Sequence, residues 1–191
     1  MEKKITHTDT EIEARFLEID VPSLRAALNA LGAEDKGEDL ITDIIFYDKA
    51  LAWSALGKTV RLRSNKQGTT LNFKHYEKNT IDGTREIECT VGSLEQAKKI
   101  LEAIGLVAYR VQEKKRHTFL YHGVSIDIDT WPLIPTYVEL EGPSERAVKE
   151  VAAQLKLPWE NAVFKNAKII IEEHYHIPVS TLTYFTFDRT E

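Results

Sequence analysis

The chain of 191 residues has 42% hydrophobic and 29% charged residues, proportions that are typical of a globular protein and exclude an intrinsically disordered one. Its net charge of −5, from 25 basic and 30 acidic residues, lacks the basic excess of proteins that hold nucleic-acid polymers. No apolar run approaches the roughly 20 residues of a membrane span, and a single cysteine, Cys89, excludes an intramolecular disulfide. We therefore expect a soluble, cytoplasmic, single-domain protein over residues 1–191, without a membrane or nucleic-acid partner.

Short segments with a period of two dominate the chain, and this alternation is typical of strands. Eight such segments are expected: Glu11–Ile19, Thr42–Asp48, Lys58–Ser64, Thr69–Tyr76, Thr84–Val91, Glu113–Tyr121, Val124–Trp131 and Tyr137–Gly142. Turn residues such as Asp82-Gly83 and His122-Gly123 lie between several of them. These short connections predict antiparallel hairpins.

Four other segments have apolar residues at helical spacing: Pro22–Leu31, the stretch from Ser93 to about Gly105, Ser144–Leu157 and Asn161–Tyr175. Ser93 and Gln96 form a capping box at the start of the second segment. The isoleucine-rich middle of the fourth is also compatible with a strand. The combination predicts the α+β class, with one sheet-dominated domain.

The strands carry polar residues at i and i+2, which places these side chains on one face of each strand. The sets are Glu11, Glu13 and Arg15; Arg61 and Arg63; Asn72 and Lys74; Glu86 and Glu88; Lys114 and Arg116; Asp127 and Asp129; and Glu139 and Glu141. One such set is typical of a solvated sheet face. Seven sets in one chain favour a different interpretation, because like charges repel on an open surface.

Most of the charged faces stand opposite an apolar face, which the helices can cover. Cys89 falls on such an apolar face and is predicted to lie in the core. With the helices outside, the charged faces turn toward one another. The pattern therefore predicts an eight-stranded antiparallel closed β-barrel with a charged interior and helices packed outside.

The two kinds of charge indicate one kind of ligand. Carboxylates bind hard divalent cations such as Mg²⁺ or Mn²⁺ through oxygen. Arg and Lys bind phosphoryl oxygens, Arg with a bidentate fork. A metal-complexed polyphosphate satisfies both sets, so the expected cofactor is Mg²⁺ or Mn²⁺ and the expected partner is a small-molecule triphosphate.

The order of these motifs resembles the CYTH superfamily, the triphosphate tunnel metalloenzymes. Glu11-Ile12-Glu13-Ala14-Arg15 is similar to the family's Glu-x-Glu-x-Lys signature, with Arg15 in place of Lys. The resemblance continues in the same order through Arg61-Leu62-Arg63, Leu71-Asn72-Phe73-Lys74, Glu86-Ile87-Glu88, Lys114-Lys115-Arg116, Asp129 and Glu139-Leu140-Glu141. It covers the chain from about residue 11 to 142 and implies a tunnel of eight antiparallel strands.

The resemblance also implies roles for individual residues. The implied phosphate-binding residues are Arg61, Arg63, Lys74, Lys114 and Arg116. The implied metal ligands are Glu11, Glu13, Glu139, Glu141 and Asp129, and the implied catalytic residues are Glu11, Glu13, Arg15 and Asp129. Glu86, Glu88 and Asp127 are supporting acidic positions. Arg15 is not expected to act as a base, because a guanidinium does not deprotonate in proteins.

Three functions remain open at this point. The favoured one is divalent-metal-dependent hydrolysis of inorganic tripolyphosphate, a nucleoside triphosphate or thiamine triphosphate, with Asp129 or a second metal activating water. The second is conversion of ATP to cyclic AMP and pyrophosphate, as in class IV adenylyl cyclases. The third is a non-catalytic module that binds polyphosphates or nucleotides. The sequence leaves the oligomeric state open, a homodimer included.

Overall fold

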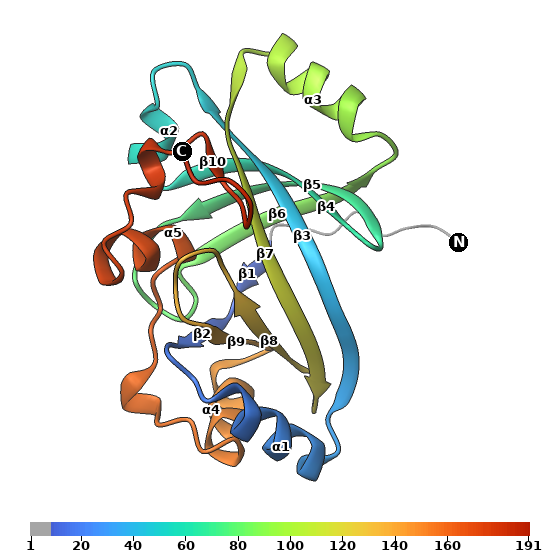
Figure 1. Cartoon of the computed structure of the whole chain (residues 1–191), viewed down its shortest axis with the longest axis vertical. Helices are drawn as coiled ribbons and strands as arrows, with labels where there is room; N and C mark the ends of the chain where they lie inside the picture. The colour runs from blue at the N-terminus through green and yellow to red at the C-terminus, as the bar shows by residue number, and fades with distance from the viewer. Residues whose placement is uncertain (1–8) are drawn as a thin grey trace.

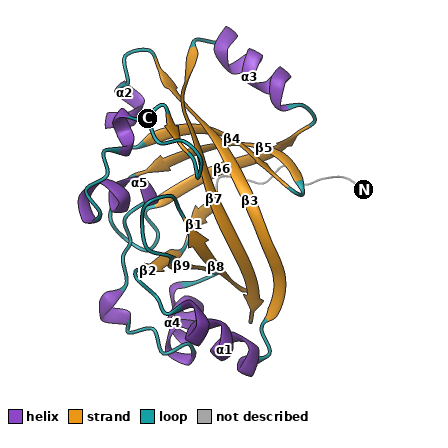
Figure 2. Cartoon of the chain, in the orientation of Figure 1, coloured by secondary structure: helices purple, strands orange, loops and turns teal. Residues whose placement is uncertain are grey.

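A computed structural model describes residues 9–191 and shows, over that range, a ten-stranded sheet with helices around it (Figures 1 and 2). The strands are β1 (Asp9–Glu11), β2 (Glu13–Phe16), β3 (Glu34–Asp48), β4 (Lys58–Asn65), β5 (Gly68–Tyr76), β6 (Thr84–Val91), β7 (Leu106–Tyr121), β8 (Val124–Thr130), β9 (Tyr137–Glu141) and β10 (Tyr184–Phe185). Their order is β1-β6-β5-β4-β3-β7-β8-β9-β2, all antiparallel, and β10 pairs with β7 in parallel. The predicted α+β class with a large antiparallel sheet is confirmed.

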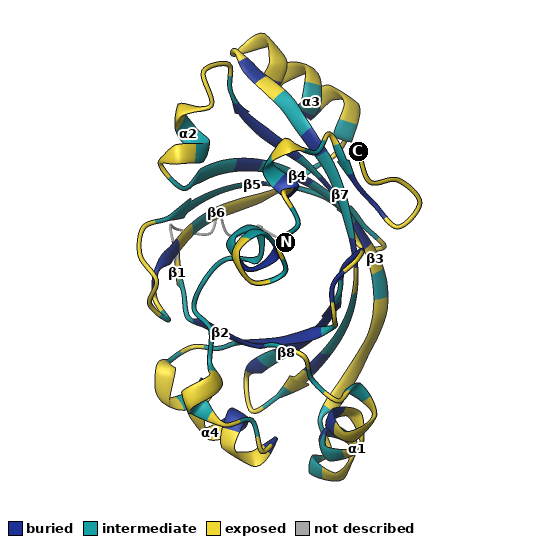
Figure 3. Ribbon diagram, turned by 60° about the vertical axis from the view of Figure 1, so that its left-hand side comes forward, coloured by how far each residue is buried: buried dark blue, intermediate teal, exposed yellow. Residues whose placement is uncertain are grey.

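The sheet curls until its two end strands, β1 and β2, lie next to each other (Figure 3). Only Ile12 separates them along the chain, yet β1 pairs with β6 and β2 pairs with β9. The backbone N–H of Glu13 instead donates to the carbonyl of Ile81 at 3.0 Å, and that of Gly142 to the carbonyl of Ile12 at 3.1 Å. Because the N-terminal strand changes partners at Ile12, the ladder over the described residues has two ends. The predicted closed, eight-stranded barrel is therefore not confirmed.

Two strands are longer than predicted. β3 begins at Glu34, eight positions before the alternation starts, and β7 begins at Leu106. The early half of each strand pairs with the late half of the other, from Glu34 opposite Leu120 to Asp48 opposite Leu106. The early half of β3 is charged and mostly exposed on both faces, so it has no apolar alternation by which to recognise it.

The helices are α1 (Val21–Leu31), α2 (Ala52–Ala55), α3 (Leu94–Ala103), α4 (Glu145–Gln154) and α5 (Ala167–Ile169). A π-helical turn, η2 (Ile170–His174), continues α5, and 3₁₀ turns form η1 (Trp159–Asn161) and η3 (Val179–Thr181). Ser93 caps α3 by accepting from the Gln96 N–H, as its capping box predicts. None of the helices in the described part of the chain is long and apolar enough to cross a membrane.

Helix α3 covers the outer face of the curled sheet at one end, and α1 and α4 cover it at the other (Figure 1). α4 packs on β2, β8 and β9, where Val138 and Leu140 are fully buried in a cluster that also takes Leu28 from α1. α3 packs on β4 and β7 around Leu62. Burial of these outward-facing apolar side chains stabilises the fold and turns the alternate, charged residues inward.

Two smaller predictions are wrong. The segment Asn161–Tyr175 is helical only from Ala167, because Val163 exchanges two backbone hydrogen bonds with Arg15, at 2.8 and 3.0 Å. Extended backbone is needed at Val163 for this pairing, and the helix starts only after Asn166, whose side chain caps it. Cys89 is exposed on β6 and does not lie in the core, because α3 packs on β4 and β7.

Candidate active site

A cavity of about 700 Å³ lies inside the curled sheet. Most of the charged residues predicted for the site line it: Glu11, Glu13, Arg15, Arg61, Arg63, Lys74, Glu86, Glu88, Lys114, Arg116, Glu139 and Glu141. They come from seven strands that span residues 9 to 141, so the curl of the sheet gathers positions that are far apart in the sequence. The charged faces of these strands therefore turn toward a shared hollow.

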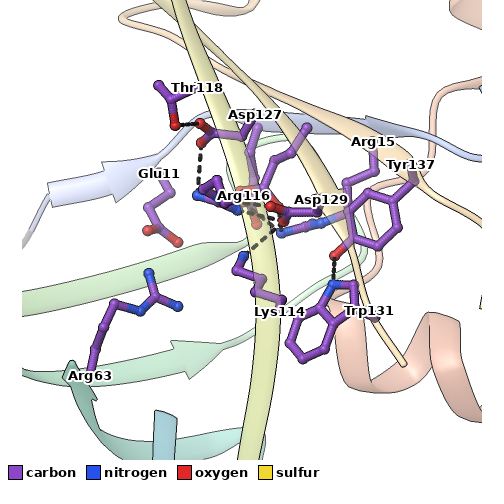
Figure 4. Close-up of polar contacts among 12 residues, drawn as sticks. Glu11, Arg15, Arg63, Lys114, Arg116, Thr118, Asp127, Asp129, Trp131 and Tyr137 are labelled. Carbon is purple, nitrogen blue, oxygen red and sulfur yellow. Dashed lines mark hydrogen bonds and ion pairs between the residues drawn. The ribbon is translucent and has the colours of Figure 1, made fainter. Parts of the chain in front are cut away.

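Asp127 and Asp129 lie on the inward face of β8, but they are in contact with Arg116 and Lys114 and do not themselves line the cavity. The Arg116 guanidinium donates to Asp127 at 2.7 Å and to both oxygens of Asp129 at 2.6 Å, while Lys114 Nζ donates to Asp129 at 2.7 Å (Figure 4). Asp129 is fully buried. Burial raises the pKa of Asp129, but the adjacent Arg116 and Lys114 outweigh this and hold it below its usual value. Both aspartates thus orient basic side chains that face the cavity.

Three further predicted phosphate-binding side chains, Arg61, Arg63 and Lys74, lie on β4 and β5. Arg63 pairs with Asp43, and Arg61 donates from Nε to Asn72 at 3.1 Å. Lys74 Nζ lies 2.7 Å from Glu11 and 3.1 Å from Glu86. These contacts hold the three basic side chains in place so that they face the cavity. Phosphoryl oxygens are the ligands that such cations bind well.

Glu11 and Glu86 are neighbouring carboxyls that share Lys74. Burial and a hydrogen bond with Glu86 raise the pKa of Glu11 to about 8. Two carboxylates this close do not both ionise easily, so one of them keeps a proton near neutral pH. With one carboxyl protonated, the pair carries a single negative charge, and the Lys74 ammonium lies next to both carboxyls.

Glu13 and Glu139 are held by a different cation, Arg15. One nitrogen of its guanidinium, Nη2, lies 2.8 Å from a Glu13 oxygen and 2.6 Å from a Glu139 oxygen, while Nη1 donates to the carbonyl of Lys165 at 3.0 Å. All three side chains are buried. Burial lowers the pKa of Arg15, but the two carboxylates outweigh it and raise that pKa well above its usual value. Arg15 therefore stays charged and carries out no proton transfer.

Glu141 stands directly opposite Glu13 in the β2–β9 pair. Within residues 9–191 no basic side chain forms an ion pair with its carboxylate. Burial and the charge of Glu139 raise the pKa of Glu141 to about 7. Like charges directly opposite each other destabilise a sheet unless a cation lies between them.

The donors suit a hard divalent cation in chemistry, since Glu11, Glu13, Glu139 and Glu141 present carboxylate oxygens to the cavity. Over the described residues, however, no three carboxylates, histidines or cysteines already converge as a ligand set. Glu11, Glu13, Glu139 and Glu141 are the side chains that would hold such an ion. The site therefore fits a divalent cation in the type and charge of its ligands, and not in a preformed coordination geometry.

The sequence patterns missed several residues of the site. Asp43 is one solitary acid on an otherwise apolar face of β3, with Ile41 and Ile45 as its i±2 neighbours, and nothing in that pattern predicts a partner. Arg110, which lines the cavity, is a second such residue and donates to the carbonyl of Val179 at 3.0 Å. Such isolated charges become recognisable only when the register of the sheet is known.

The C-terminal segment also contributes to the cavity. Asn166, Lys168 and Ile171 line it, and Lys168 Nζ lies 3.1 Å from the hydroxyl oxygen of Ser54 in α2. In Figure 1, α5 stands beside the ends of the sheet strands, on the same side as α2. The sequence predicted a helix here but not its place at the cavity.

The fold is shared with solved structures of low sequence identity. A candidate adenylate cyclase from Vibrio parahaemolyticus matches with a TM-score of 0.75 at 16% identity, over 87% of this chain and 99% of that one. The PH1012 protein of Pyrococcus horikoshii OT3 matches with a TM-score of 0.68 at 19% identity, over 82% and 96%. A candidate adenylyl cyclase from Hippeastrum with a dominant triphosphatase activity matches with a TM-score of 0.59 at 14% identity, over 87% and 96%.

A comparison with curated protein sequences finds no significant match. The sequence model of the CYTH domain matches residues 9–169, which is most of the chain and includes every charged strand described above. The order of the motifs, the curled antiparallel sheet and this match agree. The chain belongs to the CYTH domain family.

Proposed function

We propose that this protein is a divalent-metal-dependent phosphohydrolase that acts on a triphosphate bound in the charged cavity. CYTH membership and neighbours described as adenylate cyclases or a triphosphatase support an enzyme that acts on triphosphates. The observation that carries the proposal is the meeting of basic side chains from β4, β5 and β7 with carboxylates from β1, β2 and β9 around one cavity.

The basic side chains would bind and orient the phosphate chain. Arg61, Arg63, Lys74, Lys114 and Arg116 supply several donors that face the cavity, and their acidic partners hold them in place before the ligand arrives. Phosphoryl transfer depends mainly on such positioning and on charge stabilisation, so preorganised cations contribute directly to the rate.

The carboxylates would hold the metal and orient water. Glu11, Glu13, Glu139 and Glu141 would hold Mg²⁺ or Mn²⁺, which when bound neutralises phosphate charge. Glu141, which faces the cavity, would also orient the attacking water. We assign Asp129 to positioning Lys114 and Arg116, since its oxygens accept hydrogen bonds from both.

Product analysis tests the proposal. The protein is incubated with tripolyphosphate, ATP and thiamine triphosphate in parallel, with Mg²⁺ or Mn²⁺ and then with EDTA. We expect orthophosphate release that stops with EDTA and with Glu13→Ala, and that persists in Glu102→Gln, an exposed control on α3. Activity that survives EDTA or Glu13→Ala would overturn the mechanism.

The other two functions are outcomes of the same experiment. Cyclic AMP and pyrophosphate from ATP, without orthophosphate, would identify a cyclase. Tight tripolyphosphate binding without turnover in either metal would identify a binding module.

A further inference from the structure

Arg15 joins two parts of the molecule that the sequence separates by about 150 residues. Through Nη2 its guanidinium contacts Glu13 and Glu139, two carboxylates of the cavity wall. Through Nη1 it donates to the carbonyl of Lys165, 3.0 Å away and 150 residues later. The Arg15 backbone meanwhile pairs with Val163 in both directions. One residue thus connects the charged wall to the start of the C-terminal segment.

The segment that Arg15 holds is itself part of the cavity lining. Residues 166–169 and Ile171 follow directly after Lys165 and line the cavity. Apolar packing holds part of it, since Ile170 and Ile171 are buried. Its polar contacts with other elements are few: Tyr76 donates its hydroxyl to the carbonyl of Phe164 at 3.1 Å, and Lys168 reaches Ser54. The Arg15 contact is therefore a large share of the polar attachment of the 163–171 segment.

The carboxylates that Arg15 uses are also those that a divalent cation would use. The Arg15 guanidinium is a fixed positive charge within 2.8 Å of both Glu13 and Glu139. A second, doubly charged cation on the same two carboxylates would be repelled by it and would draw negative charge away from the oxygens that accept from Arg15. Binding of the divalent cation is therefore expected to weaken the contacts of Arg15 with Glu13 and Glu139.

We propose that Arg15 is a positioning residue that fastens the cavity-lining segment 163–171 to Glu13 and Glu139, and that a divalent cation bound by these carboxylates weakens this attachment and loosens the segment. The effect of the divalent cation rests on the metal binding of the proposed function, whereas the attachment of the segment by Arg15 does not. Lysine at this position, as in the family signature, would not fasten the segment to both carboxylates. Its single ammonium lacks the planar fork that reaches the two carboxylates and the Lys165 carbonyl together.

Hydrogen–deuterium exchange of the full chain, read at the amides of residues 164–171, tests the attachment. Without metal, we expect Arg15→Lys to exchange there about 10-fold faster than the wild type, because it loses a hydrogen bond from a charged donor. Tyr76→Phe is the matched control, since it removes another contact of the same segment and leaves the carboxylates paired. Exchange in Arg15→Lys equal to the wild type would overturn the attachment.

The same measurement with saturating Mn²⁺ tests the competition, with Mn²⁺ binding followed separately by electron paramagnetic resonance. We expect Mn²⁺ to accelerate exchange at 164–171 in the wild type and in Tyr76→Phe, but to add nothing in Arg15→Lys. If Mn²⁺ binds the wild type but leaves its hydrogen exchange unchanged, the competition is overturned and the attachment is not. Absence of Mn²⁺ binding would overturn both the competition and the metal dependence of the proposed function, whereas the metal-free comparison still decides the attachment.

Discussion

Asp43 and Arg63 face each other across β3 and β4, where Arg63 Nε donates to one carboxylate oxygen at 2.8 Å and Nη2 to the other at 3.1 Å. Arg61 adds a third nitrogen 3.8 Å from the same carboxylate. Because Asp43 is 1% exposed, this bidentate pair is shielded from solvent and fixes the direction of an arginine of the cavity wall.

The Asp43 pair predicts a loss of stability in acid. Burial raises the pKa of Asp43, but Arg63 and Arg61 outweigh it and hold that pKa well below the usual value. A depressed carboxyl pKa stabilises the folded state above the unfolded value of about 4, and this contribution disappears as the pH falls toward the folded pKa. We expect Asp43→Asn to lose about 3–5 kcal/mol at pH 7, where it leaves buried arginines uncompensated.

Urea unfolding between pH 2.5 and 7 measures this effect. The free energy of unfolding of Asp43→Asn should fall less steeply below pH 4 than that of the wild type, and Glu102→Gln should follow the wild type throughout. Parallel curves for Asp43→Asn and the wild type would show that the carboxylate does not couple folding to pH.

The strands could be predicted from the sequence because burial of one face imposes a period of two, as in Tyr137-Val138-Glu139-Leu140-Glu141. Here Val138 and Leu140 are fully buried against α4, and Glu139 and Glu141 face the cavity. The early half of β3, by contrast, is ordered by its pairing with β7 and is exposed on both faces. No alternation marks such a strand, so its start was missed.

The alternation also predicted which charged residues share the inward faces of the strands. It did not predict which of these side chains contact one another. The spacing placed Asp129 on the charged face, but only the register of β7 and β8 brings it opposite Arg116. The contribution of residues 166–171 also depends on a contact across 150 residues, between Arg15 and Lys165. Local patterns carry no information about such pairings.

The contacts of Asp129 predict a separation of two binding measurements. Asp129→Asn leaves Lys114 without its hydrogen-bonded carboxylate and leaves Arg116 with only Asp127 and Glu139, so both basic side chains are less firmly oriented. The loss of charge-assisted hydrogen bonds is expected to weaken tripolyphosphate binding about 10- to 100-fold. Mn²⁺ affinity should stay unchanged, because the carboxylate does not line the cavity.

Isothermal titration with tripolyphosphate and with Mn²⁺ separates these effects, and circular dichroism shows whether the variant is folded. Asp127→Asn provides a milder second variant, because Asp127 contacts Arg116 but not Lys114. Weakened Mn²⁺ binding in folded Asp129→Asn would assign the carboxylate to the metal instead.

Gly57 predicts a backbone effect at the edge of the cavity. Its φ of +69° lies in the left-handed region, and a Cβ at this position would stand 2.4 Å from the carbonyl oxygen of Tyr76. We expect Gly57→Ala to lower the free energy of unfolding by about 1–3 kcal/mol. Gly92→Ala is the matched control, because a Cβ there meets nothing within 4 Å. Equal urea midpoints for the two variants would contradict this account.

Glu141 predicts opposite changes in stability and in metal binding. Its carboxylate is buried opposite Glu13 across β2 and β9 and close to Glu139, and these like charges repel it when no metal ion is bound. Glu141→Gln removes this repulsion, so the metal-free protein should gain about 0.2–1 kcal/mol in its free energy of unfolding. The same change removes a ligand that faces the cavity, and we expect Mn²⁺ affinity to fall at least about 10-fold.

Urea unfolding in EDTA and Mn²⁺ titration of the same preparations measure the two effects, with Glu102→Gln as the control that changes neither. The opposite signs are informative, because a merely misfolded variant would lose stability and metal binding together. A variant that binds Mn²⁺ as the wild type does would remove Glu141 from the set of ligands and leave Glu11, Glu13 and Glu139 to hold the cation. In that case the gain in metal-free stability should still appear, since it depends on the carboxylates around Glu141 and not on a metal ion.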